Sequence, residues 1–165
     1  MRKKFFAGNV DLAPNQISSF NLEVEKYLKL LGSFKFHKIS SLSDAFPEKL
    51  DLLVVYAGGI EQDEFKPWLM RLAQKMKEKN SLALPTLFFA EISFATLSEM
   101  IYDSHMQNWY FDIISKEHLS SLPIRVSNLL KINDHIKELH RYENELIELQ
   151  KNYEKLEQKL IASAK

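Results

Sequence analysis

One short stretch decides the fold: DLLVVY, which runs from Asp51 to Tyr56 and is followed, after one alanine, by Gly58 and Gly59. Residues 52–56 are all apolar or aromatic, without the alternation of apolar and polar residues that marks a half-exposed strand. A continuous run of this kind is typical of a strand that is buried on both faces. Such strands occur mainly in parallel sheets, because crossover helices cover both sides. The stretch therefore predicts the central strand of an α/β fold.

Comparable apolar runs lie on either side of this stretch, and segments with helical periodicity separate them. The predicted strands are residues 4–7, 34–39, 52–56, 83–89 and 109–114. The predicted helices are residues 14–31, 41–50, 63–79, 94–103 and a last one that begins near residue 121. This alternation predicts a flavodoxin-like fold, with a five-stranded parallel sheet in the order 2-1-3-4-5, over residues 1–130.

The last helix has no stop signal before the end of the chain, and it carries a heptad pattern from Ile132 onward. The a positions are Ile132, Leu139, Leu146, Tyr153 and Leu160, and the d positions are His135, Tyr142, Leu149, Leu156 and Ser163. A helix over residues 121–164 is ~66 Å long, whereas a domain of ~130 residues has a radius of gyration of only ~14 Å. We therefore expect residues 131–165 to form a coiled-coil helix that makes a homodimer. The predicted dimer seam consists of Ile132, Leu139, Tyr142, Leu146, Leu149, Tyr153, Leu156 and Leu160.

The alternatives for this segment are a single solvated helix and a tail that packs on its own domain. The orientation of the paired helices also stays open. A parallel dimer would place Glu138 beside Glu143 of the other copy, which is a like-charge pair.

The composition limits the classes of function. The chain has 165 residues, 45% of them hydrophobic, which is enough for one domain and an appendage. Its 22 basic and 22 acidic residues give no electrostatic footprint for nucleic acid or an anionic membrane. The absence of cysteine excludes disulfides and thiolate metal sites and fits a reducing cytosol. No apolar run approaches the ~20 residues of a membrane span, so we expect a cytoplasmic protein with no membrane insertion.

Several short motifs lie at the ends of the predicted strands and in the segments that follow them. They are the strand ending in Tyr56, Asp63-Glu64-Phe65, residues 84–90 ending in Ala90, residues 112–116 ending in Lys116, and Arg125-Val126 with Leu129-Leu130. In this order and spacing the motifs resemble the receiver domain of response regulators, the phospho-accepting module of bacterial two-component signalling. The resemblance covers about residues 1–130.

The resemblance implies that the phosphorylation chemistry is lost. Tyr56 stands where receivers have the acceptor aspartate, and Ala90 stands where they have a switch serine or threonine. The acidic pair that holds Mg²⁺ falls on Gly8 and Asn9, or on Asn9 and Val10. Lys116 is the candidate for the retained lysine, whereas counting without an insertion puts Asp112 there. A phenol, with a pKa near ~10, is no substitute for a carboxylate nucleophile, and a lone carboxylate is a poor magnesium site. We therefore expect no enzyme activity, no metal and no cofactor.

Receiver domains commonly bind partners through the face around their fourth helix and fifth strand. The corresponding candidates are Met100, Tyr102, His105, Met106 and Trp109, although the core is the commoner place for any one of them. We expect a phosphorylation-independent signalling or scaffold module that binds a signalling protein and dimerises through its last helix. One alternative is the regulatory domain of a larger enzyme, a diguanylate cyclase or histidine kinase, with its output domain beyond Lys165. Another is a small-ligand sensor with Tyr56 and Asn9 in the crevice beyond the strands.

Overall fold

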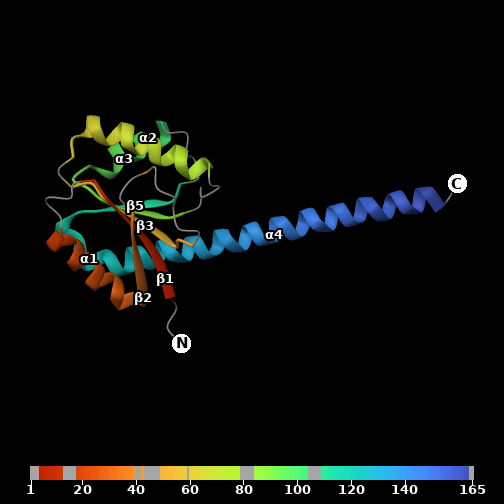
Figure 1. Cartoon of the computed structure of the whole chain (residues 1–165), viewed down its shortest axis with the longest axis horizontal. Coiled ribbons are helices and arrows are strands. Elements are labelled where there is room, and N and C mark those ends of the chain that lie inside the picture. The colour runs from red at the N-terminus through yellow and green to blue at the C-terminus, as the bar shows by residue number, and fades with distance from the viewer. Residues whose placement is uncertain are drawn as a thin grey trace. The chain divides into compact units, whose positions relative to one another are not determined.

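The sheet has the predicted strand order. The computed structural model describes residues 4–12, 18–39, 42, 49–58, 60–78, 84–103 and 109–163. It contains one parallel sheet in the order β2-β1-β3-β4-β5 (Figure 1). The strands are β1 (Lys4–Asp11), β2 (Ser33–Ile39), β3 (Leu52–Tyr56), β4 (Thr86–Phe89) and β5 (Phe111–Ile114). The flavodoxin-like α/β fold predicted from the sequence is confirmed.

Helices follow the strands. They are α1 (Ser18–Leu31), α2 (Gln62–Glu78), α3 (Phe94–Asp103), the 3₁₀ helix η1 (Lys116–Ser121) and α4 (Leu122–Ser163). The predicted helix over 41–50 falls mostly outside the described residues, as does the predicted start of the first helix at residue 14. The last helix begins one residue later than expected, because the chain first makes the 3₁₀ turns of η1.

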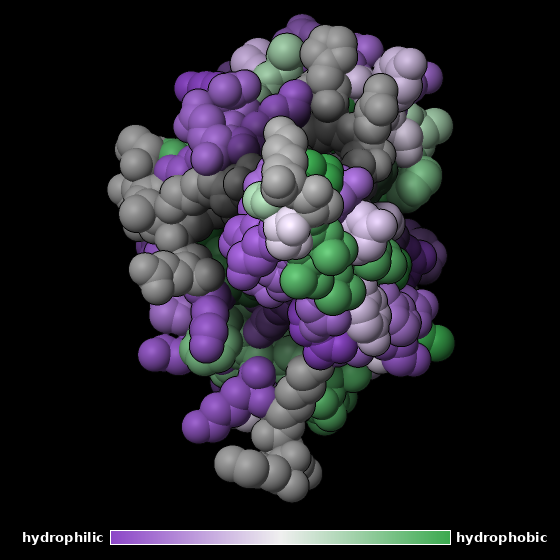
Figure 2. All heavy atoms as spheres, turned by 90° about the vertical axis from the view of Figure 1, so that its right-hand side faces the viewer, coloured by the Kyte–Doolittle hydropathy of each residue, from purple (hydrophilic) through white to green (hydrophobic). Residues whose placement is uncertain are grey.

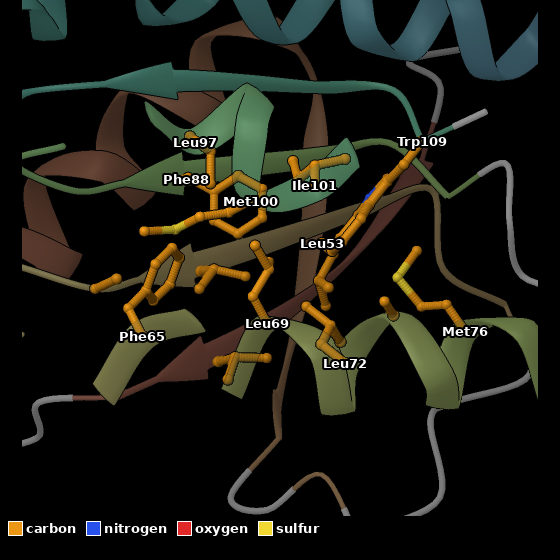
Figure 3. Close-up of a cluster of buried hydrophobic side chains, with 14 of the residues drawn as sticks. Leu53, Phe65, Leu69, Leu72, Met76, Phe88, Leu97, Met100, Ile101 and Trp109 are labelled. Atoms are coloured by element: carbon orange, nitrogen blue, oxygen red, sulfur yellow. The ribbon is translucent and has the colours of Figure 1, made fainter. Parts of the chain in front are cut away.

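The central strand β3 divides the core into two layers, since successive side chains of a strand point to opposite faces. Leu53 and Val55 pack in one cluster with side chains of α2 and α3, which is shown in Figure 3. Leu52, Val54 and Tyr56 pack in the other cluster with side chains of α1 and the first turns of α4. In Figure 1, α2 and α3 cover one face of the sheet, and α1 and the start of α4 cover the other. All five residues of β3 are buried, as the apolar run predicts.

Strand β1 is longer than predicted, and this difference moves the edge of the sheet. The sequence prediction places its end at Ala7. The structure continues the strand to Asp11, and Val10 is buried between Ile39 of β2 and Val55 of β3. The side chain of Val10 is buried, and its strand position pairs with both β2 and β3, which stabilises the longer strand.

Two of the predicted partner-contact residues are core residues instead. Met100 and Trp109 are buried in the α2–α3 cluster, so the expectation that they contact a partner is wrong (Figure 3). The indole Nε1 of Trp109 donates a hydrogen bond of 2.8 Å to the buried Oγ1 of Thr86. A buried indole N–H needs such an acceptor, and Thr86 supplies it from the neighbouring strand β4. Because Trp109 precedes β5, it belongs to the loop, not to the predicted strand over 109–114.

The chain divides into two compact units, Met1–Asn133 and Asp134–Lys165, where the sequence suggests residues 1–130 and 131–165. The first turns of α4 belong to the first unit, in which Leu122, Val126 and Leu129 are buried. Arg125 Nη1 binds Asp112 Oδ1 of β5 at 2.7 Å and thereby ties α4 to the edge of the sheet. Among the described segments, we find no helix that combines the length and the apolar character needed to cross a bilayer.

Candidate functional site

The carboxyl ends of the strands are where an α/β fold of this order binds ligands. The pairing register places Asp11 beside Tyr56, Tyr56 beside Phe89, and Phe89 beside Ile114. Two further backbone hydrogen bonds extend this edge: Leu12 N donates to Tyr56 O at 3.0 Å, and Ala57 N donates to Phe89 O at 2.8 Å. Backbone hydrogen bonding between the strands therefore continues up to Tyr56 at the carboxyl edge of the sheet.

Tyr56 is a core residue. Its side chain is only 1% exposed, and its ring stacks on Phe89 with centroids 5.3 Å apart and an interplanar angle of 14°. Both rings belong to the cluster beneath α1 and α4. An acceptor of a phosphoryl group must be reached by a phosphodonor in solution. The position implied by the receiver resemblance instead carries a ring that fills the core.

Gly8, one of the positions that the resemblance aligns with the acidic pair, lies inside the sheet and not at its edge. It pairs with Leu53, three residues before the Asp11–Tyr56 pair. A Cβ atom on Gly8 would lie 2.8 Å from Ile39 Cδ1, 3.0 Å from Leu50 Cδ1 and 3.2 Å from Leu53 Cδ1. The glycine is there because three apolar side chains occupy the space of its missing Cβ. Gly8 therefore does not lie at the carboxyl edge of the sheet, and the β1 residue that the register brings beside Tyr56 is Asp11.

We expect Gly8→Ala to lower the free energy of unfolding by about 1–2 kcal/mol, because the new methyl group overpacks the core. Gly58→Ala is the matched control, since a Cβ at Gly58 meets nothing within 4 Å. We expect the control to change stability by no more than about 0.5 kcal/mol. Urea unfolding followed by circular dichroism measures both. Equal stability of the Gly8→Ala protein and the unmodified chain would contradict the packing assigned to β1.

The other two receiver-like positions lie where β4 and β5 end. Ala90 follows β4 and is buried in the α2–α3 cluster. Its methyl side chain has no hydroxyl group, and little of it is exposed to solvent. Asp112 pairs with Leu87 inside β5, two residues before the strand ends, and its carboxylate binds Arg125. Lys116 comes after the strand and begins η1. The register thus favours Lys116 over Asp112 as the residue at the sheet edge, although the side chain of Lys116 is outside the described part.

A shallow pocket of about 470 Å³ opens beside this edge. Its lining comes from the loops after β3 and β4 and from the first residues of α2, and consists of Ile60, Glu61, Gln62, Asp63, Glu91 and Ile92. The three carboxylates are exposed to solvent. Their negative charge opposes the binding of phosphate groups and other anions in this pocket. The sequence did not indicate this pocket, because its two lining segments, residues 60–63 and 91–92, are separated in the chain and meet only in the folded protein.

The structure describes no converging set of metal ligands. Among residues 4–12, 18–39, 42, 49–58, 60–78, 84–103 and 109–163, no three His, Asp or Glu side chains form a group that could hold an ion. The side chains of Asn9 and Asp11 are outside the described set, so the expected absence of a metal stays a prediction.

The second candidate site is the apolar surface of α4. Between Leu139 and Leu160 every predicted seam residue is exposed, with relative exposures from 51% to 70%. These residues are Leu139, Tyr142, Leu146, Leu149, Tyr153, Leu156 and Leu160. Figure 2, which faces the C-terminal end of α4, shows hydrophobic surface in green next to hydrophilic surface in purple. A row of exposed large apolar residues of this length marks an interaction site.

The exposed seam is distinct from the positions of α4 that pack in the core. In the same heptad frame the buried residues Leu122, Val126, Leu129, Leu130 and Asn133 occupy positions b, e and f. The exposed seam residues from Leu139 to Leu160 occupy positions a and d, and Ile124, Ile147 and Ile161 are also exposed, at g and b positions. Ile132, the first seam residue, is only half-buried. From Leu139 onward the a and d positions are therefore not used for packing on the sheet, and they stay available for another helix.

The remaining predicted partner-contact residues have different outcomes. Tyr102 on α3 is 72% exposed. His105 and Met106 lie outside the described residues. The neighbouring Asp103 accepts a hydrogen bond of 2.7 Å from Lys66 Nζ of α2, which holds the end of α3 against α2. Of the five candidates, Tyr102 is the one that the described surface presents to a partner.

No family model matches this sequence, and no curated protein matches it either. The likeness to receiver domains therefore stays a resemblance that rests on the quoted residues.

Proposed function

We propose that this chain is a phosphorylation-independent signalling or scaffold module of the cytoplasm and not an enzyme. Its α/β domain, a degenerate relative of receiver domains, binds a partner protein. The a and d residues of α4 pair two copies of the chain.

The exposed seam of α4 is the observation that carries the proposal. Transfer of a leucine side chain from water to an apolar contact contributes about 1.5–3 kcal/mol. Five exposed leucines and two tyrosines recur at a and d positions between Leu139 and Leu160. A seam of this period is matched by the same seam on a second helix, through knobs-into-holes packing.

The sheet edge supports the non-catalytic part of the proposal. Tyr56 is buried and stacked where receivers have their nucleophile, and Ala90 has no hydroxyl group. Gly8 has no space for a side chain. Partner binding is then a matter of surface recognition, for which exposed Tyr102 on α3 is suited because its ring is large and rigid and its hydroxyl can form a hydrogen bond.

The direct test is incubation of the full chain with acetyl phosphate and Mg²⁺, followed by intact-mass spectrometry. We expect no phosphoryl adduct, because the ring at position 56 is buried. A receiver domain that retains its acceptor aspartate, treated in parallel, is the positive control. A stable phosphoryl adduct on an aspartate of this chain would overturn the proposal.

A further inference from the structure

We infer that the two copies of α4 pair in antiparallel orientation, with Leu146 of one copy against Leu149 of the other at the centre. This inference rests on the proposed self-pairing of α4 and adds its orientation and register. Its basis is the distribution of charge beside the exposed seam.

When two copies of α4 run antiparallel, the apolar residues of one seam pack against the apolar residues of the other. In an antiparallel pair, each a residue packs against a d residue of the second helix. With Leu146 and Leu149 at the centre, Leu139 meets Leu156, and Tyr142 meets Tyr153. Every layer between residues 139 and 156 is then apolar or aromatic, and like side chains meet in each. At the ends of the seam, Leu160 meets His135.

Charge decides the orientation. In antiparallel helices the g positions of the two copies are neighbours, as are the e positions. In this register Glu138 lies beside Lys159 of the second copy, and the twofold axis generates the same contact twice. The other close pairs at g and e are Glu145 with Asn152, Glu143 with Gln150, and Ile136 with Glu157. None of them joins two like charges.

A parallel pair in register has the opposite electrostatics. Its g residues neighbour the e residues five positions further along the second helix. Glu138 then faces Glu143, and this repulsion also occurs twice. Lys159 faces Ala164 and gains no partner. The apolar seam fits either orientation, so the flanking charges favour the antiparallel pair.

Charge reversal at Glu138 distinguishes the two orientations by the sign of its effect. In the antiparallel pair, Glu138→Lys replaces two attractions with two repulsions, and we expect the dimer Kd to rise about fivefold at low salt. Lys159→Glu should have the same effect, and the double variant Glu138→Lys, Lys159→Glu should restore the original Kd. In a parallel pair Glu138→Lys removes the repulsion from Glu143 and lowers the Kd. Glu148→Lys, at an exposed c position outside the pair, is the matched control.

Disulfide formation tests the register independently. The chain has no cysteine, so each introduced thiol is unique. We expect affinity-tagged Leu139→Cys, mixed with untagged Leu156→Cys under mild oxidation, to give the mixed disulfide. Neither variant alone should cross-link, because residue 139 and its copy are ~25 Å apart along an antiparallel pair, and a disulfide spans Cα atoms only ~4–7 Å apart.

The outcomes are separable by analytical ultracentrifugation and denaturing gels. A weaker dimer for Glu138→Lys together with the mixed disulfide supports the antiparallel pair. A tighter dimer for Glu138→Lys, or disulfide formation by Leu139→Cys alone, overturns the inference but leaves the self-pairing of α4 intact. A chain that sediments as a monomer at all concentrations overturns both. A dimer that none of the charge or cysteine variants affects places the interface elsewhere and also overturns both.

Discussion

Replacement of both Leu146 and Leu149 by aspartate is expected to convert the proposed dimer into a monomer. The two leucines are 65% and 64% exposed in the single chain, so neither substitution removes a core contact. In the pair they form the central layer, and four leucines lose about 1.5–3 kcal/mol each, or about 6–12 kcal/mol in total. Four carboxylates in that layer add desolvation and mutual repulsion. Light scattering over a range of concentrations should show the mass of one chain.

Ile147→Asp is the control for this experiment. Ile147 is next to Leu146, is itself 50% exposed, and occupies a b position outside the seam. The same kind of substitution there should leave the dimer intact. Circular dichroism should show that the α/β domain stays folded in both variants. A double variant that keeps the dimer mass would show that α4 does not join the two copies.

Tyr56→Asp, which restores the receiver-like acceptor residue, is expected to destabilise the α/β domain by about 3–5 kcal/mol and not to create a phosphorylation site. The substitution removes a buried ring that stacks on Phe89 and leaves a cavity. It also places a carboxyl group among apolar side chains, where the charged form is strongly disfavoured. Since domains have total stabilities of about 5–15 kcal/mol, this is a large part of the whole. Urea unfolding gives the stability, and intact-mass spectrometry after acetyl phosphate treatment tests the chemistry.

Tyr56→Phe is the matched variant, because it keeps the ring and its stacking on Phe89. We expect it to remain within about 1.5 kcal/mol of the unmodified chain. A Tyr56→Asp protein as stable as the Tyr56→Phe protein would mean that the ring is not part of the core. A phosphorylated Tyr56→Asp protein would mean that the sheet edge keeps a working metal site.

The fold was predictable because its signals are local. The apolar run over 52–56 identifies a strand buried on both faces, and the helical spacing of Phe65, Leu69, Leu72 and Met76 identifies the helix that covers one of them. Parallel strands with intervening helices permit few arrangements, since crossovers are right-handed. The bounds of α3, residues 94–103, agree with the sequence prediction for the same reason.

The candidate site at the sheet edge was less predictable, because it depends on register. The resemblance to receiver domains aligns Gly8 with the acidic pair, yet side chains from Ile39, Leu50 and Leu53 fill the space beside it. These residues come from other segments of the chain, so the local sequence carries no sign of them. Trp109 was likewise predicted to contact a partner. In the structure its indole N–H donates a hydrogen bond to Thr86 on the neighbouring strand.

The sequence by itself determined the α/β alternation and the heptad of α4, because both depend on the spacing of apolar residues along the chain. The strand order followed from the alternation, since parallel strands with crossover helices permit few arrangements. Only the tertiary structure decided that β1 continues to Asp11, that Tyr56 and Trp109 are core residues, and that the seam of α4 from Leu139 to Leu160 stays exposed while Leu122, Val126, Leu129, Leu130 and Asn133 are buried. Those outcomes depend on which surfaces meet, and apolar side chains have the same spacing whether their partner lies in the same chain or in another one.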